Sequence, residues 1–128
     1  MFASAALMAA CSSDVAGPSD VQGVWRLTSI QRPDASVTAI ADPARFTVSF
    51  AAGGRLSVRA DCNSCGGSYQ LADGSLATGP LACTRAFCVS TAPLDTWFVG
   101  ILDGRSTVSL GGGRLTVASE RGTLLFER

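Results

Sequence analysis

RFTVSFAAGGRLSVRA, residues 45–60, alternates apolar and polar side chains on both sides of a glycine turn. Phe46, Val48 and Phe50 fall on one face of a predicted strand, because successive side chains of a strand point to opposite faces. Residues 55–60 alternate in the same way, and residues 51–54 form the turn between the two segments. The pattern predicts a β-hairpin with one apolar face.

Strand-forming segments continue on both sides of this hairpin. Their β-branched and apolar content predicts further strands at residues 24–30, 68–71, 75–78, 106–110, 114–119 and 123–127. Asp73-Gly74 lies between two of them, which is a strong hairpin signal. We predict loops at residues 31–44, at the cysteine-bearing residues 61–67, and at residues 79–91.

One segment has helical spacing instead. Its apolar side chains recur at i, i+3, i+4, i+7 and i+8, at Leu94, Trp97, Phe98, Ile101 and Leu102. Strands joined by short connections must pair mostly antiparallel. The expected fold class is therefore α+β: a mostly antiparallel, curled β-sheet of about eight short strands with one helix packed on it.

Composition narrows the function. The 128 residues carry 10 arginines, no lysine, 10 acidic residues and no histidine, so the formal charge is zero. A neutral domain lacks the positive surface that nucleic-acid binding requires, so we expect no nucleic-acid partner. The absence of histidine excludes Ser-His-Asp and Cys-His catalysis. Hydrophobic residues make up 47% of the chain, which is typical of a folded domain.

The N-terminus resembles the signal of a bacterial lipoprotein. Residues 1–10 are apolar and uncharged, and LMAAC at residues 7–11 ends in two small residues and a cysteine. We interpret residues 1–10 as the remnant of a signal peptide, Cys11 as a lipidated residue, and residues 11–20 as a flexible tether. Residues 21–128 are the folded domain. Several acyl chains on Cys11 would hold the domain on a membrane. Ser12 is consistent with an outer-membrane location facing the periplasm, if the bacterium has two membranes.

Four cysteines remain in the domain: Cys62, Cys65, Cys83 and Cys88. An even number in a small exported domain predicts a disulfide framework with three conceivable connectivities, local, crossed and nested. A zinc tetrathiolate is disfavoured because export would oxidise the thiols. Redox catalysis at Cys62-Asn63-Ser64-Cys65 is disfavoured because no helix follows that spacing. We predict structural disulfides, no metal ligands and no cofactor.

The order of these motifs resembles the META domain family, which includes the heat-shock lipoprotein HslJ. The resemblance covers residues 21–128. It rests on a Trp-x-Leu strand, a Phe-rich strand with a glycine turn, a Gly-Cys-Asn motif followed by Gly and Tyr, a Thr-Arg-x-x-Cys motif before a helix, and an apolar closing strand pair. In this chain the Trp-x-Leu strand is Trp25–Leu27, the Phe-rich strand with its glycine turn is Phe46–Gly54, and the Gly-Cys-Asn motif is Asp61–Asn63, followed by Gly67 and Tyr69. The Thr-Arg-x-x-Cys motif is Thr84–Cys88, which precedes the helix predicted at Leu94–Leu102. The closing strand pair contains Leu115 and Leu124–Phe126. Asp61 departs from the pattern by replacing the usual glycine.

The resemblance implies a mostly β domain with a helix, exported or membrane-anchored, linked to stress responses and without an established activity. If Cys62 and Cys88 are the pair shared with the family, Cys65 pairs with Cys83 and the connectivity is nested. The motif residues Asn63, Tyr69, Thr84 and Arg85 are candidates for holding the loops or for surface recognition.

The leading hypothesis is a non-enzymatic, lipid-anchored, monomeric envelope domain that acts under stress or binds an envelope protein. The alternative is a periplasmic or envelope binder of small hydrophobic ligands, with a cavity lined by Trp25, Phe46, Tyr69 and Trp97. An enzyme is disfavoured because no catalytic spacing is present; the only glutamates, Glu120 and Glu127, lie near the C-terminal strand. An inhibitor-like loop at residues 79–91 is a further hypothesis.

Overall fold

The computed structural model describes residues 18–89 and 92–128. Within them the elements are α1 (Pro18–Val21), β1 (Gly23–Gln31), β2 (Val37–Ala39), the 3-10 helix η2 (Pro43–Arg45), β3 (Phe46–Ala51), β4 (Arg55–Ala60), β5 (Asn63–Ala72), β6 (Ser75–Thr78), β7 (Ala82–Cys83), α2 (Leu94–Leu102), β8 (Gly104–Gly111), β9 (Arg114–Ser119) and β10 (Gly122–Glu127).

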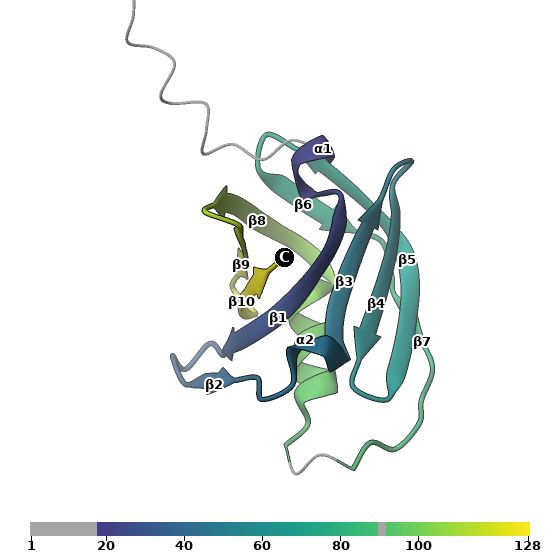
Figure 1. The fold of residues 1–128 in the computed structure, drawn as a ribbon, viewed down its shortest axis with the longest axis vertical. Helices are drawn as coiled ribbons and strands as arrows, with labels where there is room; N and C mark the ends of the chain where they lie inside the picture. Colours follow the sequence, from purple (N-terminus) through teal and green to yellow (C-terminus); the bar gives the residue numbers. More distant parts are fainter. Residues whose placement is uncertain (1–17, 90–91) are drawn as a thin grey trace, which may run out of the picture.

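Most strands form one closed antiparallel barrel (Figure 1). Neighbours follow the order β1-β3-β4-β5-β6-β8-β9-β10, and β10 pairs back onto β1. β2 is added to β1 and β7 to β5. The predicted α+β class, a curled sheet with a helix packed on it, is therefore wrong: the domain is a mostly β barrel. In an open sheet, the outer backbone N–H and C=O groups of β1 and β10 would lack hydrogen-bond partners. Closure of the barrel pairs them with each other.

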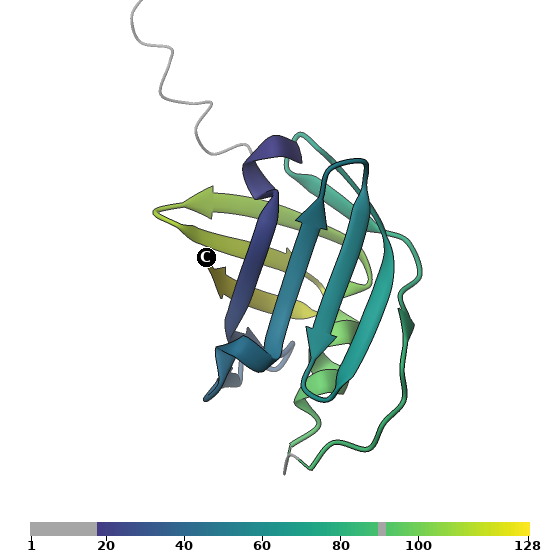
Figure 2. The same ribbon diagram turned by 45° about the vertical axis from the view of Figure 1, so that its right-hand side comes forward.

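Two long strands act as the corners of the barrel. The first residues of β1 pair with β3, whereas residues from Arg26 onward pair with β10, with a register shift between Leu27 and Ser29. In β5, residues 63–68 pair with β4 and residues 69–72 pair with β6. Each strand therefore belongs to two walls, which cross each other in Figure 2.

The two hairpins expected from the sequence are present. Phe46 is opposite Ala60 and Ala51 is opposite Arg55, with Phe46, Val48 and Phe50 buried. At the β5–β6 turn, Asp73 has φ +52° and Gly74 has φ +76°. A two-residue turn with both central φ angles positive favours this pair of residues.

The loop expected at residues 61–67 is mostly strand. β5 begins at Asn63, five residues before the predicted start at residue 68, and the two strands β2 and β7 fall within predicted loops. Cys, Gly and Ser have weak strand propensity, so local composition hid the beginning of β5. Its strand conformation comes from long-range pairing, with Cys65 opposite both Val58 and Cys83.

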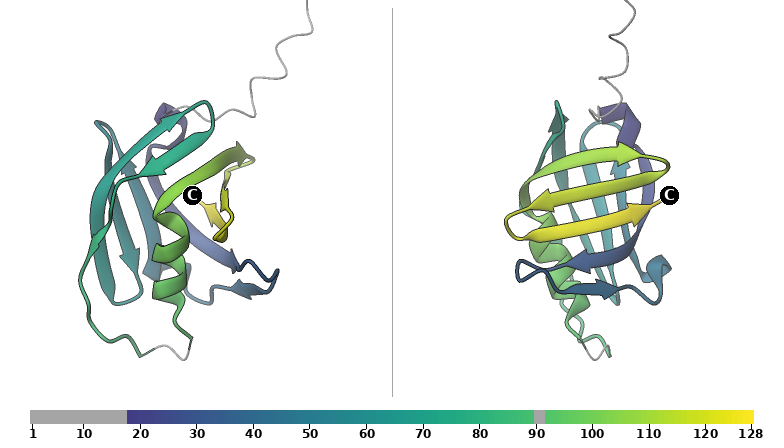
Figure 3. Two further views of the ribbon diagram at one scale, coloured as in Figure 1. Left: turned by 180° about the vertical axis from the view of Figure 1, so that it is seen from behind. Right: turned by 90° about the vertical axis from the view of Figure 1, so that its left-hand side faces the viewer.

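Helix α2 stands between the barrel walls at the end opposite α1 (Figure 3). Phe98 is fully buried, and its ring centroid is 6.3 Å from that of Phe46 on β3 and 5.9 Å from that of Phe126 on β10. Ile101 and Leu102 are also buried, as the apolar spacing predicts. The helix thus plugs the barrel where β5 has separated from β6. No helix among the described residues is long and apolar enough to cross a bilayer.

The N-terminal boundary lies slightly earlier than expected. Pro18–Val21, of which residues 18–20 were predicted to be tether, form α1. Val21 is buried, and its carbonyl accepts a 2.8 Å hydrogen bond from Trp25 Nε1. The predicted lipidation residue, Cys11, lies outside the described residues.

Candidate functional site

The candidate site begins at the turn from β4 into β5. Asp61 has φ +60°, a conformation in which glycine is the usual residue. Its carboxylate lies 2.8 Å from Arg45 Nη2 and accepts a 2.9 Å hydrogen bond from Arg45 Nε. Its backbone N–H donates to the Arg45 carbonyl at 2.8 Å. This ion pair explains how an aspartate is held at the position where the family resemblance implies glycine.

Two disulfides join β5 to the segment that precedes α2. Cys62 is bonded to Cys88 and Cys65 to Cys83, which is the nested connectivity. Cys65 and Cys83 also face each other in the β5–β7 register. Residues 83–89, which we call the bridged loop, are therefore attached covalently to the barrel near both ends.

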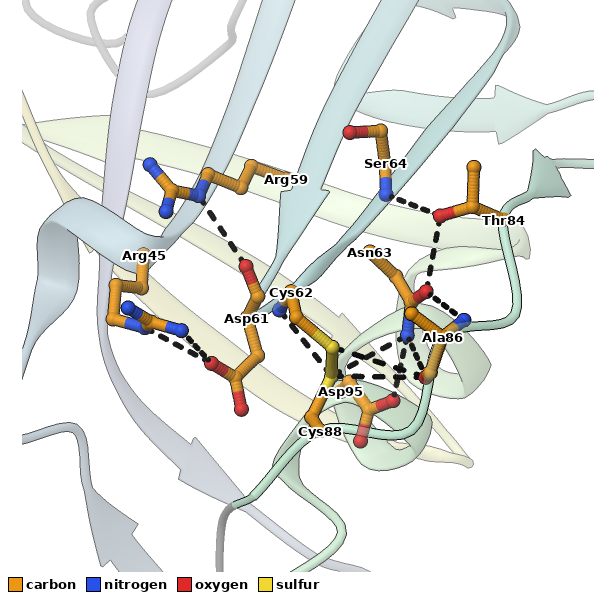
Figure 4. Close-up of a disulfide and its surroundings, with 10 residues drawn as sticks. All are labelled: Arg45, Arg59, Asp61, Cys62, Asn63, Ser64, Thr84, Ala86, Cys88 and Asp95. Carbon is orange, nitrogen blue, oxygen red and sulfur yellow. Dashed lines mark hydrogen bonds and ion pairs between the residues drawn. A yellow bond between two sulfur atoms is a disulfide. The ribbon is translucent and has the colours of Figure 1, made fainter.

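Asn63 connects the bridged loop to β5 by side-chain hydrogen bonds (Figure 4). Its Oδ1 accepts hydrogen bonds from the Ala86 N–H at 2.7 Å and from Thr84 Oγ1 at 3.0 Å. Its Nδ2 donates to the Ala86 carbonyl at 3.1 Å and to Asp95 Oδ2 at 3.4 Å. The amide thus pairs with the Ala86 backbone as a neighbouring strand would, which assigns a structural role to Asn63 and Thr84.

A surface groove of about 540 Å³ lies between this network and α2. Asn63, Thr84, Arg85 and Asp95 supply its polar lining, and Leu81 and Val99 are among its apolar residues. Arg85 is exposed, and no hydrogen bond or ion pair fixes its side chain within the described part of the chain. Three of the four motif residues therefore meet at one groove.

Tyr69, the fourth motif residue, lies elsewhere. It is buried in the barrel, where its ring packs edge-on against Phe50 and its hydroxyl donates to the Ala51 carbonyl at 2.9 Å. Trp25 and Phe46 are also core residues, whereas Trp97 is half-buried beneath Arg32. These four aromatic residues do not line a common cavity.

The sequence did not reveal three features of the site. Asp95 is brought to Asn63 only by the helix packing. Phe87 and Val89, on either side of Cys88, expose 96% and 92% of their surface. No pattern in the sequence indicated their exposure, because residues 84–89 do not form a strand and their side chains do not alternate between buried and exposed.

The arrangement is suited to binding. All four domain thiols are consumed in disulfides, so a thiolate nucleophile or zinc tetrathiolate would first require their reduction. Within residues 18–89 and 92–128, no three metal-ligating side chains are grouped. What the groove offers is an amide, a hydroxyl and a carboxylate group held by the Asn63 network, together with the unrestrained Arg85 guanidinium, beside two exposed apolar side chains.

Solved structures share this fold. An NMR structure of a protein superposes with a TM-score of 0.68 at 27% identity, covering 88% of this chain and 94% of its own. An NMR structure of a protein from Burkholderia xenovorans gives 0.69 at 22% identity, covering 99% and 98%. A crystal structure of a lipocalin-like protein from Bacteroides uniformis gives 0.57 at 19% identity, covering 88% and 99%.

No curated protein matches the chain. The match to a family model is more specific than the similarity of fold. The model of the META domain matches residues 19–128, which include every described strand, both disulfides and the Asn63 network. With that match over nearly the whole length, the chain belongs to the META domain family.

Proposed function

We propose that this META domain is a non-enzymatic binding module of the cell envelope, which recognises a protein partner through the bridged loop. The observation that carries the proposal is the exposure of Phe87 and Val89 on a loop held by two disulfides. Exposed apolar side chains that are rigidly presented lose little entropy on binding, so they favour association.

We further propose that lipidated Cys11 attaches the domain to a membrane and that its role is in the stress response, as in lipoproteins of the HslJ type. The bridged loop extends from the pole of the domain opposite α1 (Figure 1). A membrane attached ahead of α1 would leave this loop directed away from that membrane. This direction supports a partner other than the anchoring lipid.

We rank this proposal above the hydrophobic-ligand alternative because side chains occupy the barrel interior. The Phe46, Phe98 and Phe126 rings pack in a row through the helix-plugged end. A ligand inside the barrel would have to displace them and would leave less apolar burial for the fold.

A site-specific photo-crosslinker tests the proposal in the native host. Placed at Phe87 in the full chain, it is expected to give a discrete adduct with an envelope protein. The matched control is Val37 on β2, which is 64% exposed and lies outside the bridged loop. Equal adducts from both positions, or none from Phe87, would contradict recognition by the bridged loop.

The anchor and the stress role need separate tests. Cys11→Ser is expected to release the protein from the membrane fraction, and an unchanged membrane fraction would contradict the lipid anchor. In a strain lacking the gene, the wild-type chain should restore growth under heat stress, whereas Phe87→Ser/Val89→Ser should not. Equal rescue by both would contradict a stress function that acts through this loop.

A further inference from the structure

A second pocket lies on the other side of α2 from the groove described above. Three distant segments meet there: Arg32 and Pro33 after β1, Trp97 and Ile101 on α2, and Arg121 in the β9–β10 turn. Its volume is about 270 Å³. We call it the arginine pocket because, among the residues that the structure describes, Arg32 and Arg121 are its only charged lining residues.

Arg32 is held by its planar face. Its Cζ lies 4.2 Å from the centroid of the Trp97 ring. A guanidinium stacked on an aromatic ring keeps its N–H groups at the edge, where they can bind an anion. The nearby Asp34 is engaged elsewhere: hydrogen bonds from the Ser36 hydroxyl and N–H lower the pKa of Asp34, and the charge of Arg32 adds a smaller effect.

The side chain of Arg121 is held by hydrogen bonds to backbone carbonyls. Its Nη2 donates to the Arg105 carbonyl at 2.8 Å and to the Ile101 carbonyl, near the end of α2, at 3.2 Å. The guanidinium packs over Gly104, where an added Cβ would lie only 3.3 Å from Nη2. Its Nε is buried without a hydrogen-bond partner among the described residues. A buried donor left in this state costs free energy.

Neither cation is held in an ion pair. Within the described part of the chain, neither Arg32 nor Arg121 lies within ion-pair distance of a carboxylate. Two positioned guanidinium groups beside an indole ring, in a pocket without an acid, complement a negatively charged group attached to a flat apolar body.

We propose that the arginine pocket binds a small aromatic or planar carboxylate. The carboxylate lies between Arg32 and Arg121, and the ring packs beside Trp97 and Ile101. The volume, about 270 Å³, is slightly below the usual range for ligand pockets and suits a single-ring acid better than a lipid. This site is distinct in position and chemistry from the bridged loop, so either proposal can fail without the other.

A titration of the ¹⁵N-labelled full chain with benzoate, followed by NMR, tests this. The Trp97 indole N–H and the Arg121 Nε–H are expected to shift saturably, with a dissociation constant on the order of 1 mM. The Trp25 indole N–H, buried and bonded to the Val21 carbonyl, is the internal control and should not move. Benzamide, the neutral analogue, should bind at least about tenfold more weakly.

Variants locate the site. Arg32→Gln and Arg121→Gln are each expected to weaken benzoate binding by at least about tenfold. Arg32→Gln is the safer variant, since Arg121 also holds the end of α2. Arg114→Gln, which removes an arginine whose side chain is 75% exposed, is the matched control and should bind benzoate as the wild type does.

Three outcomes would overturn the proposal. They are the absence of saturation at a benzoate concentration on the order of 50 mM, equal binding of benzamide, and unchanged binding by Arg32→Gln. A titration with inorganic phosphate distinguishes binding of any anion from recognition of a planar carboxylate. If phosphate binds as tightly as benzoate, the ring contributes nothing and the assignment to a planar carboxylate is wrong.

Discussion

Phe98 and Phe87 are phenylalanines on neighbouring segments, yet their surroundings are opposite. Phe98 is fully buried between the barrel walls, whereas Phe87 exposes 96% of its surface. Packing holds the first region. Disulfides and one asparagine side chain hold the second. The bridged loop can therefore change its outward residues at little cost to the barrel, because its shape does not depend on burying them.

The largest expected effect is in the packed region. Phe98→Ala should lower the free energy of unfolding by about 3–5 kcal/mol, because it opens a cavity between Phe46 and Phe126. Denaturant unfolding measures the change. Thr96→Ala, on the exposed face of the same helix, should cost less than about 0.5 kcal/mol. Similar losses in both variants would show that α2 does not complete the core.

Removing the outer disulfide should have the next largest effect. Cys62→Ala/Cys88→Ala releases a bridge that spans 26 residues, which should cost about 3 kcal/mol. Amide hydrogen exchange should accelerate at Ala86 while β3 and β4 stay protected. Uniform loss of protection across the barrel would mean that the bridge supports the core as well as the loop.

Asn63→Ala should cost less, about 1–3 kcal/mol, because it removes a buried amide that makes hydrogen bonds to Thr84, Ala86 and Asp95. Thermal unfolding with the disulfides intact measures it. Gln70→Ala removes an exposed side-chain amide from the same strand and is expected to be nearly neutral. If the two variants were equally stable, the disulfides alone would suffice to shape the bridged loop.

Phe87→Ser/Val89→Ser is expected to have the smallest effect on folding, within about 0.5 kcal/mol of the wild type. Both side chains are almost fully exposed and contribute little burial. Denaturant unfolding again provides the measurement, with Val37→Ser as control. A loss above about 2 kcal/mol would place these residues in the core and remove the contrast between the two regions.

The sequence predicted the local elements of the fold better than their closure. Alternation at Phe46, Val48 and Phe50 and helical spacing around Phe98 report burial directly, and both were confirmed. Closure depends on β1 pairing with both β3 and β10 across a register shift at Leu27 and Ser29. No local pattern encodes a pairing between residues almost a whole chain apart, so the sequence predicted a curled sheet with a helix packed on it and not the closure of that sheet.

The candidate site was predictable where residues are close in sequence. Thr84 and Arg85 share one motif, and Asn63 lies beside a cysteine of the framework. Asp95 and the arginine pocket were missed because helix packing and a turn from the far end of the chain create them. Tyr69 illustrates the reverse: it follows the Gly-Cys-Asn motif to which Asn63 belongs, but strand alternation turns its side chain into the barrel.

The seam between β1 and β10 also has a consequence for the timing of folding. Ile30 pairs with Leu124, and Arg128 donates to the Gln22 and Asp20 carbonyls while its guanidinium stacks on Trp25. Such distant contacts slow folding, because a large loop must close before they form. The barrel cannot complete itself until β10 has been synthesised, so the nascent chain stays open while its earlier parts emerge.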